Sequence, residues 1–116
     1  MEKLILKSIE VMAIGSNIPE DFDKQVYVFV GEENTRDYAL FKLYILSCKR
    51  LEKYEEHSDE AGMYLRFTLI MKYYDENIVK KHIQQILAQC NQNPTEKRFN
   101  CLSLYLRSEI EEDVYY

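Results

Sequence analysis

One amphipathic stripe constrains the fold of this chain more than any other feature. Apolar side chains recur at helical spacing along residues 75–90, at Ile78, Val79, Ile83, Ile86, Leu87 and Cys90. The opposite side of the same helix would hold Lys80, Lys81, Gln84, Gln85 and Gln89. Asp75 is placed to accept the free amide hydrogen bonds at the helix start. The pattern predicts a helix that lays its apolar side on another layer.

Four segments ahead of this helix have the composition of β-strands, at residues 2–12, 24–31, 38–48 and 62–73. Residues 26–30 are β-branched or aromatic throughout, and Gly31 ends the run. Residues 38–48 are apolar at nearly every position, which fits either a buried strand or a buried helix. We favour a strand, because the connection from Gly31 to Asp37 suits a hairpin.

Alternation places the apolar residues of the first and fourth segments. In the first segment Ile5, Ile9 and Val11 share one side of the strand, and Leu4 and Leu6 point the other way. Turn residues at 15–17 and 19–21 predict a loop before the second strand. In the fourth segment one hydrophobic row is formed by Met63, Leu65, Phe67, Leu69 and Met71. Residues 49–61 are polar and predict a short helix or a loop.

The C-terminal part offers two patterns. Residues 93–96 break the helix, and a second helix at 95–106 would turn Phe99, Leu102 and Leu106 inward. Alternation through Leu102, Leu104 and Leu106 fits a strand instead, and we favour the helix. A short strand at 107–112 would extend the sheet. The sequence therefore predicts one α+β domain spanning residues 1–116, an antiparallel sheet of four to five strands with two C-terminal helices packed on one face.

Composition narrows the class of function. A chain of 116 residues with 47% hydrophobic content can build a core without metals or disulfides. Its 20 acidic and 15 basic residues give a formal charge of -5, which favours a basic protein partner over nucleic acid. Cys48, Cys90 and Cys101 lack CxxC spacing, which is typical of reduced core thiols. With no secretion signal and no apolar run long enough for a membrane span, we expect a cytoplasmic protein.

Motifs for catalysis, cofactors or metals are missing from the sequence. His57 and His82 belong to no metal-ligand pattern, and His82 falls beside the apolar stripe. The three glycines form no phosphate-binding loop, and no nucleophile motif occurs. We therefore expect no enzyme, no cofactor, no metal and no catalytic residue.

The spacing of Tyr74, Asp75, Val79, Ile83, Leu87 and Cys90 resembles a helix of the immunity-eight family of bacterial polymorphic-toxin immunity proteins. Further landmarks occur in the family's order, at residues 7–9, 19–21, 31, 48–51 and 109–112. The resemblance covers nearly the whole chain. The chain departs from the family pattern at Phe22, where a second proline is expected, and at residues 47–50, which lack a Cys-Thr-Pro turn.

The resemblance implies a cytosolic protein that binds and neutralises a cognate toxin domain by blocking its active site or substrate surface. Many such toxins are nucleases with cationic clefts, which an acidic inhibitor can steer toward and occupy. We expect the toxin to contact acidic and aromatic residues of the C-terminal segment, namely Glu109, Glu111, Glu112, Asp113, Tyr115 and Tyr116. A second acidic cluster that we expect to contact the toxin is Glu55, Glu56, Asp59 and Glu60. A frayed, solvated terminus explains the first cluster equally well.

Two other classes of function remain open. The first is a small domain that sequesters a nucleotide or metabolite, as in phage counter-defence, in a pocket ringed by Tyr38, Tyr44, Tyr64 and Tyr73. The second is a hydrolase, which requires two acids buried in one cleft with strongly shifted pKa values.

Overall fold

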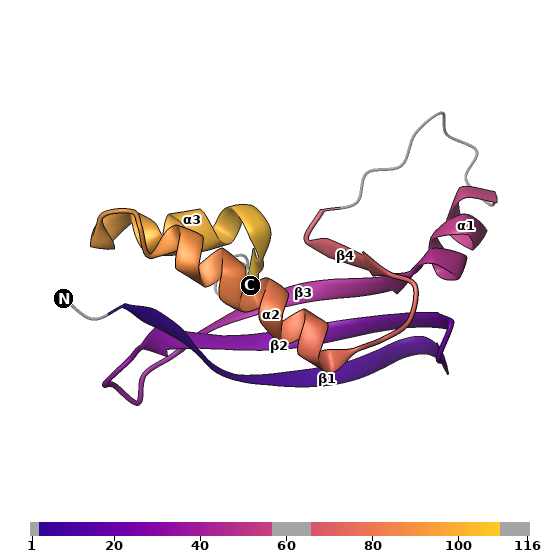
Figure 1. Cartoon of the computed structure of the whole chain (residues 1–116), viewed down its shortest axis with the longest axis horizontal. Coiled ribbons are helices and arrows are strands. Elements are labelled where there is room, and N and C mark those ends of the chain that lie inside the picture. The colour runs from indigo at the N-terminus through magenta and orange to yellow at the C-terminus, as the bar shows by residue number, and fades with distance from the viewer. Residues whose placement is uncertain (1–2, 57–65, 110–116) are drawn as a thin grey trace, which may run out of the picture.

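The computed structural model describes residues 3–56 and 66–109, without the side chains of residues 14–17 and 54–56. A single sheet lies beneath two helices, α2 and α3, and α1 lies at one end of the sheet (Figure 1). The strands are β1 (Leu4–Ile18), β2 (Asp21–Glu32), β3 (Ala39–Ser47), β4 (Thr68–Met71) and β5 (Arg107–Ser108). The helices are α1 (Cys48–Glu56), α2 (Glu76–Cys90), the short 3-10 helix η1 (Thr95–Lys97) and α3 (Arg98–Tyr105). This arrangement confirms the predicted α+β class.

The strand order is β1-β2-β3-β4, and β5 also pairs with β3. The β1–β2, β2–β3 and β3–β5 pairs are antiparallel, whereas β4 runs parallel to β3. Because α1 lies between β3 and β4 along the chain, the two strands enter the sheet in the same direction. The strand predicted at 62–73 is therefore shorter among the described residues and joins in parallel.

The predicted hairpin between β2 and β3 is confirmed. Its pairing runs from Asp23 opposite Leu46 to Val30 opposite Ala39. Gly31 sits where the returning chain passes, and a Cβ atom there would collide with the backbone oxygen of Asp37. The glycine is required by this close approach of backbone to backbone.

Four apolar residues of β1 face the core together, contrary to the alternation predicted for this strand, whereas Met12 and Ile18 are exposed. Leu4 is buried, and Leu6, Ile9 and Val11 also pack against the core. The β1–β2 register shifts between Leu6 and Ser8. A bulge adds one residue to one strand, so Leu4 and Leu6 before it come to the same face as Ile9 and Val11 after it. The prediction that Leu4 and Leu6 lie on the face opposite to Ile9 and Val11 was wrong for this reason.

The first strand is also longer than predicted. β1 continues through residues 15–17, where a loop was expected, and the chain turns at Pro19 and Glu20. A second register shift, between Ala13 and Asn17, accommodates the turn-forming residues within the strand pair.

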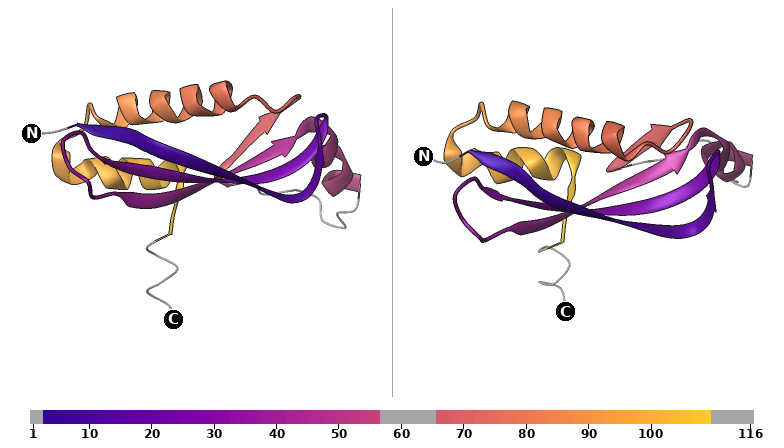
Figure 2. Two further views of the ribbon diagram at one scale, coloured as in Figure 1. Left: turned by 90° about the horizontal axis from the view of Figure 1, so that it is seen from below. Right: turned by 60° about the horizontal axis from the view of Figure 1, so that its bottom comes forward.

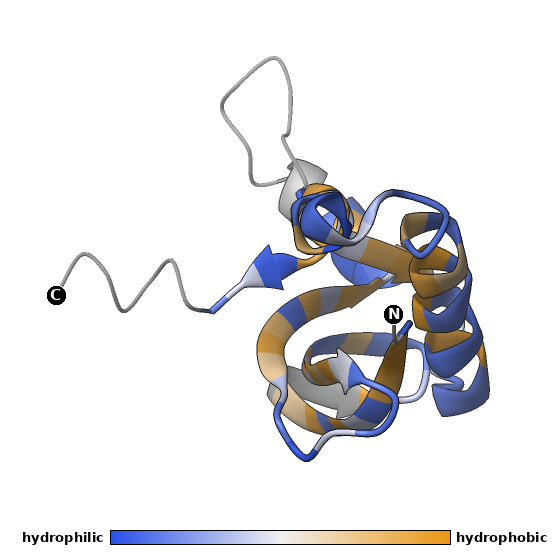
Figure 3. Cartoon of the chain, turned by 90° about the vertical axis from the view of Figure 1, so that its left-hand side faces the viewer, coloured by the Kyte–Doolittle hydropathy of each residue, from blue (hydrophilic) through white to orange (hydrophobic). Residues whose placement is uncertain are grey.

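Helix α2 matches its prediction closely. Asp75 caps it by accepting a hydrogen bond from the Asn77 amide at 2.9 Å. Its buried residues are Val79, Ile83, Ile86, Leu87 and Cys90. The prediction was wrong for Ile78, which lies at the edge of the stripe and is 52% exposed. The buried residues meet the valines of β2 and the apolar residues of β3 in one core. In Figure 3 apolar and polar residues alternate around this helix and along the strands. The burial of this stripe is a main source of stability for the fold.

The end of α2 also holds the edge of the sheet. The side chain of Asn91, the residue that caps α2, accepts a hydrogen bond from the Leu4 amide at 2.9 Å. It donates one to the Leu4 carbonyl at 2.8 Å. The amide of Asn91 therefore stands where a neighbouring strand would pair with β1.

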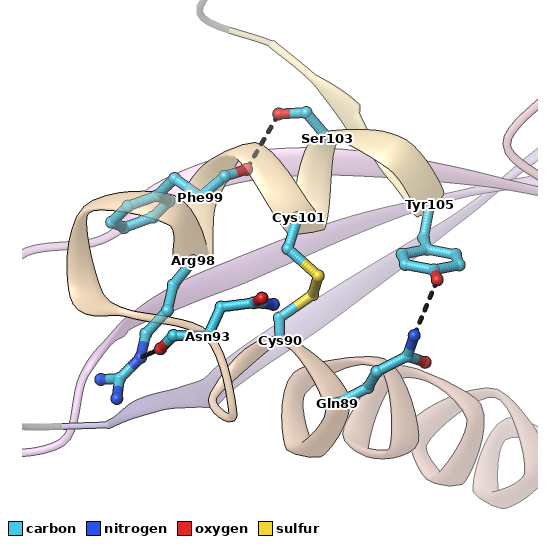
Figure 4. The surroundings of a disulfide bond; sticks show 8 residues. All are labelled: Gln89, Cys90, Asn93, Arg98, Phe99, Cys101, Ser103 and Tyr105. Atoms are coloured by element: carbon cyan, nitrogen blue, oxygen red, sulfur yellow. Dashed lines mark hydrogen bonds between the residues drawn. A yellow bond between two sulfur atoms is a disulfide. The ribbon is translucent and has the colours of Figure 1, made fainter.

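The helix expected at 95–106 is confirmed as η1 followed by α3. Leu102 and Leu106 are buried, and Phe99 stacks on Phe41 with ring centroids 6.4 Å apart. Figure 4 shows a disulfide between Cys90 of α2 and Cys101 of α3, with Cα atoms 5.5 Å apart.

The prediction of reduced thiols was thus wrong for Cys90 and Cys101. Their sequence separation of 11 carries no motif, but the turn after α2 folds α3 back along it and brings the two sulfur atoms together. The third cysteine, Cys48, is free and exposed instead of lying in the core.

Candidate functional site

The helices cover one face of the sheet, and among the described residues no helix covers the other (Figure 2). Val26 and Val28 of β2 point toward the helices with no exposed surface, so the intervening side chains point away from them. The register places Tyr27 between Glu10 of β1 and Lys42 of β3. We call this uncovered side the open face; it includes Glu10, Gln25, Tyr27, Phe29, Lys42, Tyr44, Arg107 and Glu109.

A lysine lies at the centre of the open face. The ammonium of Lys42 is 5.4 Å from the ring centroid of Tyr27 and 5.9 Å from that of Tyr44. Its Nζ is 3.1 Å from Oε1 of Glu109, and the two side chains are only 11% and 16% exposed. Both cation–π distances fall within the range of attraction. Lys42 is therefore held by two aromatic rings and one carboxylate.

Pairing with Glu109 changes the pKa of Lys42. Partial burial acts to lower the pKa of Lys42, but the hydrogen bond to Glu109 and the charge of that carboxylate outweigh it and raise the pKa. Lys42 is consequently charged at neutral pH and unsuited to act as a base or a nucleophile. The pair fixes the centre of the open face.

Strand β5 brings the C-terminal part of the chain onto this face. Arg107 pairs with Lys42 in the register, and the Glu109 amide donates to the Leu40 carbonyl at 3.1 Å. The guanidinium of Arg107 donates to the Tyr44 hydroxyl at 2.8 Å. The open face is thus assembled from β1, β2, β3 and β5.

A second charged cluster joins α1 to the sheet. Oδ1 of Asp21 is 2.9 Å from Nε of Arg50, and Oδ2 is paired with Lys53. The hydrogen bond from Lys53, with the positive charges of Arg50 and Lys53, lowers the pKa of Asp21 despite the opposing effect of burial. A carboxyl held ionised in this way lacks the raised pKa that a general acid needs. Asp21 therefore positions α1 and gives no support to a hydrolase.

Glu109 is the one predicted toxin-contacting side chain that the structure describes. It lies on the open face, bound to Lys42, and so is less accessible than an exposed acid would be. Residues 55 and 56 belong to α1, although their side chains are not described. The other predicted residues lie outside the described parts of the chain: Glu111, Glu112, Asp113, Tyr115, Tyr116, Asp59 and Glu60.

The tyrosines proposed to ring a small-molecule pocket do not gather in the described structure. Tyr38 packs edge-on against Phe29 and lines a pocket of about 290 Å³ at the hairpin. Tyr73 lines a different pocket of about 230 Å³ beside Cys48, and the two pockets share no residue. Tyr44 is bonded to Arg107, and Tyr64 lies outside the described residues. These positions do not support the nucleotide-binding alternative.

Other chemical features are sparse. Partial burial lowers the pKa of His82, which fits the expected place beside the apolar stripe of α2. Within residues 3–56 and 66–109, no group of three or more His, Cys, Asp or Glu residues is arranged to hold a metal ion. No helix in this part of the chain is long and apolar enough to cross a membrane.

Sequence reasoning missed the centre of the open face. Lys42 interrupts the otherwise apolar run of β3, between Phe41 and Leu43, and that single charge was the available signal. Its partners Tyr27 and Glu109 are distant in sequence and become neighbours only through strand pairing. The cluster therefore could not be assembled from local patterns.

The aromatic and charged side chains gathered on the open face are of the kind found where proteins contact a partner. The family model described as Immunity protein 8 matches residues 4–113, and the chain belongs to this family. No curated protein and no solved structure matches the chain. Family membership gives the protein an immunity role in a polymorphic toxin system, a role that generally involves no catalysis.

Proposed function

We propose that this protein neutralises its cognate toxin by binding it through the open face, and that the toxin is a basic nuclease whose active site or substrate surface is thereby blocked in the cytoplasm. The observation that carries the proposal is the uncovered aromatic surface around Lys42 and Glu109. Tyrosine combines a large apolar area with a hydroxyl, and it is enriched among the residues that dominate binding energy.

The acidic C-terminal segment would add negative charge to the same interface. Glu109 lies on the open face, and the chain continues from it through Glu111, Glu112 and Asp113. Carboxylates that begin at the docking surface suit a toxin whose cleft binds phosphates. The aromatic anchors we assign to this segment are Tyr115 and Tyr116. The acids that we assign to a second contact are Glu55, Glu56, Asp59 and Glu60.

Calorimetry with the cognate toxin domain tests the proposal. We expect a stoichiometric complex whose affinity falls as salt rises, because opposite charges would meet across the interface. Reversing Glu111, Glu112 and Asp113 together to lysine should weaken binding at least about tenfold, as expected when several complementary charges are lost. Glu96→Lys, an exposed acid of η1 in the helix layer, is the matched control.

The outcomes of this experiment test the binding surface and the chemistry of the toxin separately. Unchanged affinity after the triple reversal would remove the C-terminal segment from the interface. Unchanged affinity after substitutions on the open face as well would move the interface elsewhere. An assay of nucleic-acid cleavage by the free toxin tests its chemistry independently, and absence of cleavage would reject the nuclease assignment.

A further inference from the structure

The disulfide of Cys90 and Cys101 bridges the core and the surface of the helix layer. Cys90 ends α2 and has no exposed surface, whereas Cys101 lies in α3 and is partly exposed (Figure 4). The Cα separation of 5.5 Å suits an ordinary disulfide without backbone movement. Of the two cysteines, Cys101 is therefore the one nearer to solvent and to small thiols.

The disulfide is a covalent link between helices α2 and α3 in addition to the chain that joins them. Helix α3 has eight residues, fewer than an isolated helix needs to persist in water. Its other links to the molecule include the buried Leu102 and Leu106, and the stacking of Phe99 on Phe41. Figure 4 shows two hydrogen bonds of the same helix, from Arg98 to the Asn93 carbonyl and from Gln89 to the Tyr105 hydroxyl. The disulfide closes the short loop between α2 and α3 and so restricts how far α3 can move away.

Helix α3 is connected to the open face directly, because the chain runs from its end into β5. Leu106 ends α3, and β5 follows at once with Arg107. Two residues further on, Glu109 is paired with Lys42, and Arg107 is bonded to Tyr44. A loosened α3 therefore loosens the two contacts that organise the centre of the open face.

We propose that Cys90 and Cys101 are a reversible redox pair whose oxidation fixes Arg107 and Glu109 on the open face and thereby strengthens toxin binding. The effect on binding rests on the proposed function, because it takes the open face as the toxin surface. The oxidant is a low-molecular-weight disulfide such as glutathione disulfide. The Cys101 thiolate attacks it and releases one thiol, and the Cys90 thiolate then displaces the second. In total the protein gives up two protons and two electrons, and the disulfide becomes two thiols.

The experiment compares the two redox states of the whole protein carrying Cys48→Ser, which removes the exposed free thiol. One sample is reduced with dithiothreitol and the other oxidised with glutathione disulfide, and the thiols are counted by alkylation and mass spectrometry. We expect two fewer thiols in the oxidised state and an affinity for the toxin at least about fivefold higher, the lower range of ordinary coupling between sites. Amide exchange at Leu106 and Glu109, which donate to Leu102 and Leu40, should be slower in the oxidised state.

A variant with Cys90→Ala and Cys101→Ala supplies the control. Its affinity for the toxin should equal that of the reduced protein and should not change on addition of dithiothreitol. The affinity of the Cys48→Ser variant should equal that of the wild type in each redox state. Equal amide exchange in both states, or failure to form the disulfide at any glutathione ratio, would overturn the proposal. Equal affinity despite a difference in exchange would overturn its effect on binding. If neither state binds toxin, the proposed function fails, and the exchange data still decide whether the redox pair controls β5.

Discussion

Beneath α2, β2 presents valines such as Val26 and Val28 with no exposed surface, whereas on the open face the intervening positions hold Tyr27 and Phe29. The covered side uses stiff aliphatic chains that interlock with the helices. The open side uses aromatic chains, which accept partial exposure and still offer a large area to a partner. In the proposed function, therefore, one side of these strands provides stability and the opposite side binds the toxin.

The largest expected effect tests the covered side. Ile83→Ala removes a side chain with no exposed surface and should lower the free energy of unfolding by about 2–5 kcal/mol, because it leaves a cavity beneath α2. Urea denaturation measures the loss. Ile78→Ala on the same helix, 52% exposed, should change the free energy by less than about 0.5 kcal/mol. Equal losses in the two variants would break the comparison.

The next effect tests the open side. Tyr27→Ala should weaken toxin binding by about 2 kcal/mol, the usual cost of removing an aromatic anchor from an interface. Calorimetry gives the affinity, and a parallel denaturation curve shows how much of the change comes from stability. Leu104→Ala, an exposed apolar residue of α3, should leave the affinity unchanged. A loss at Leu104 without one at Tyr27 would assign binding to the helix layer.

A third effect sharpens the comparison inside the open face. Glu109→Gln removes the charge that pairs with Lys42 and should cost about 1–3 kcal/mol of stability, the usual penalty when a buried polar group loses its partner. Glu76→Gln breaks an exposed pair with Lys80 whose atoms are 3.7 Å apart, and should cost less than about 0.5 kcal/mol. Urea denaturation of both variants, with Lys42→Met in a double-mutant cycle, measures the difference. Similar costs would mean that burial adds nothing to the Lys42 pair.

The smallest expected effect concerns pH. The pKa of Asp21 is lowered in the folded protein, chiefly by the hydrogen bond from Lys53. The stability that follows is fully present above the unfolded pKa of about 3.9 and is lost as the pH falls through the lower folded value. Denaturation curves between neutral and acidic pH should show this loss, and Asp21→Asn should lack that part of it. An identical pH profile in the variant would remove Asp21 as the cause.

Local patterns predicted the elements that depend on neighbouring residues. The apolar spacing of α2 and the cap at Asp75 are set within a few turns, and both are found as expected except that Ile78 is exposed. The run at β2 and the hairpin to β3 likewise follow from composition and loop length. The helix favoured over a strand at α3 was also confirmed.

Features that depend on register or on distant contacts escaped prediction. The bulge near Lys7 exists only in relation to β2, so alternation along β1 alone assigned the wrong faces. The bond between Cys90 and Cys101 depends on how tightly the chain turns after α2. Lys42 is paired with Glu109, which lies far along the chain and reaches it only through the pairing of β5 with β3. Each case requires knowledge of the packed structure.

Asn91 has a consequence for behaviour at high concentration. An outer strand of a sheet is a template onto which further chains can add, and such growth leads to fibres. Because one amide side chain occupies both backbone groups of Leu4, a foreign strand cannot dock there without first displacing the helix terminus. At this end of β1, therefore, a single polar residue blocks the addition of a further strand.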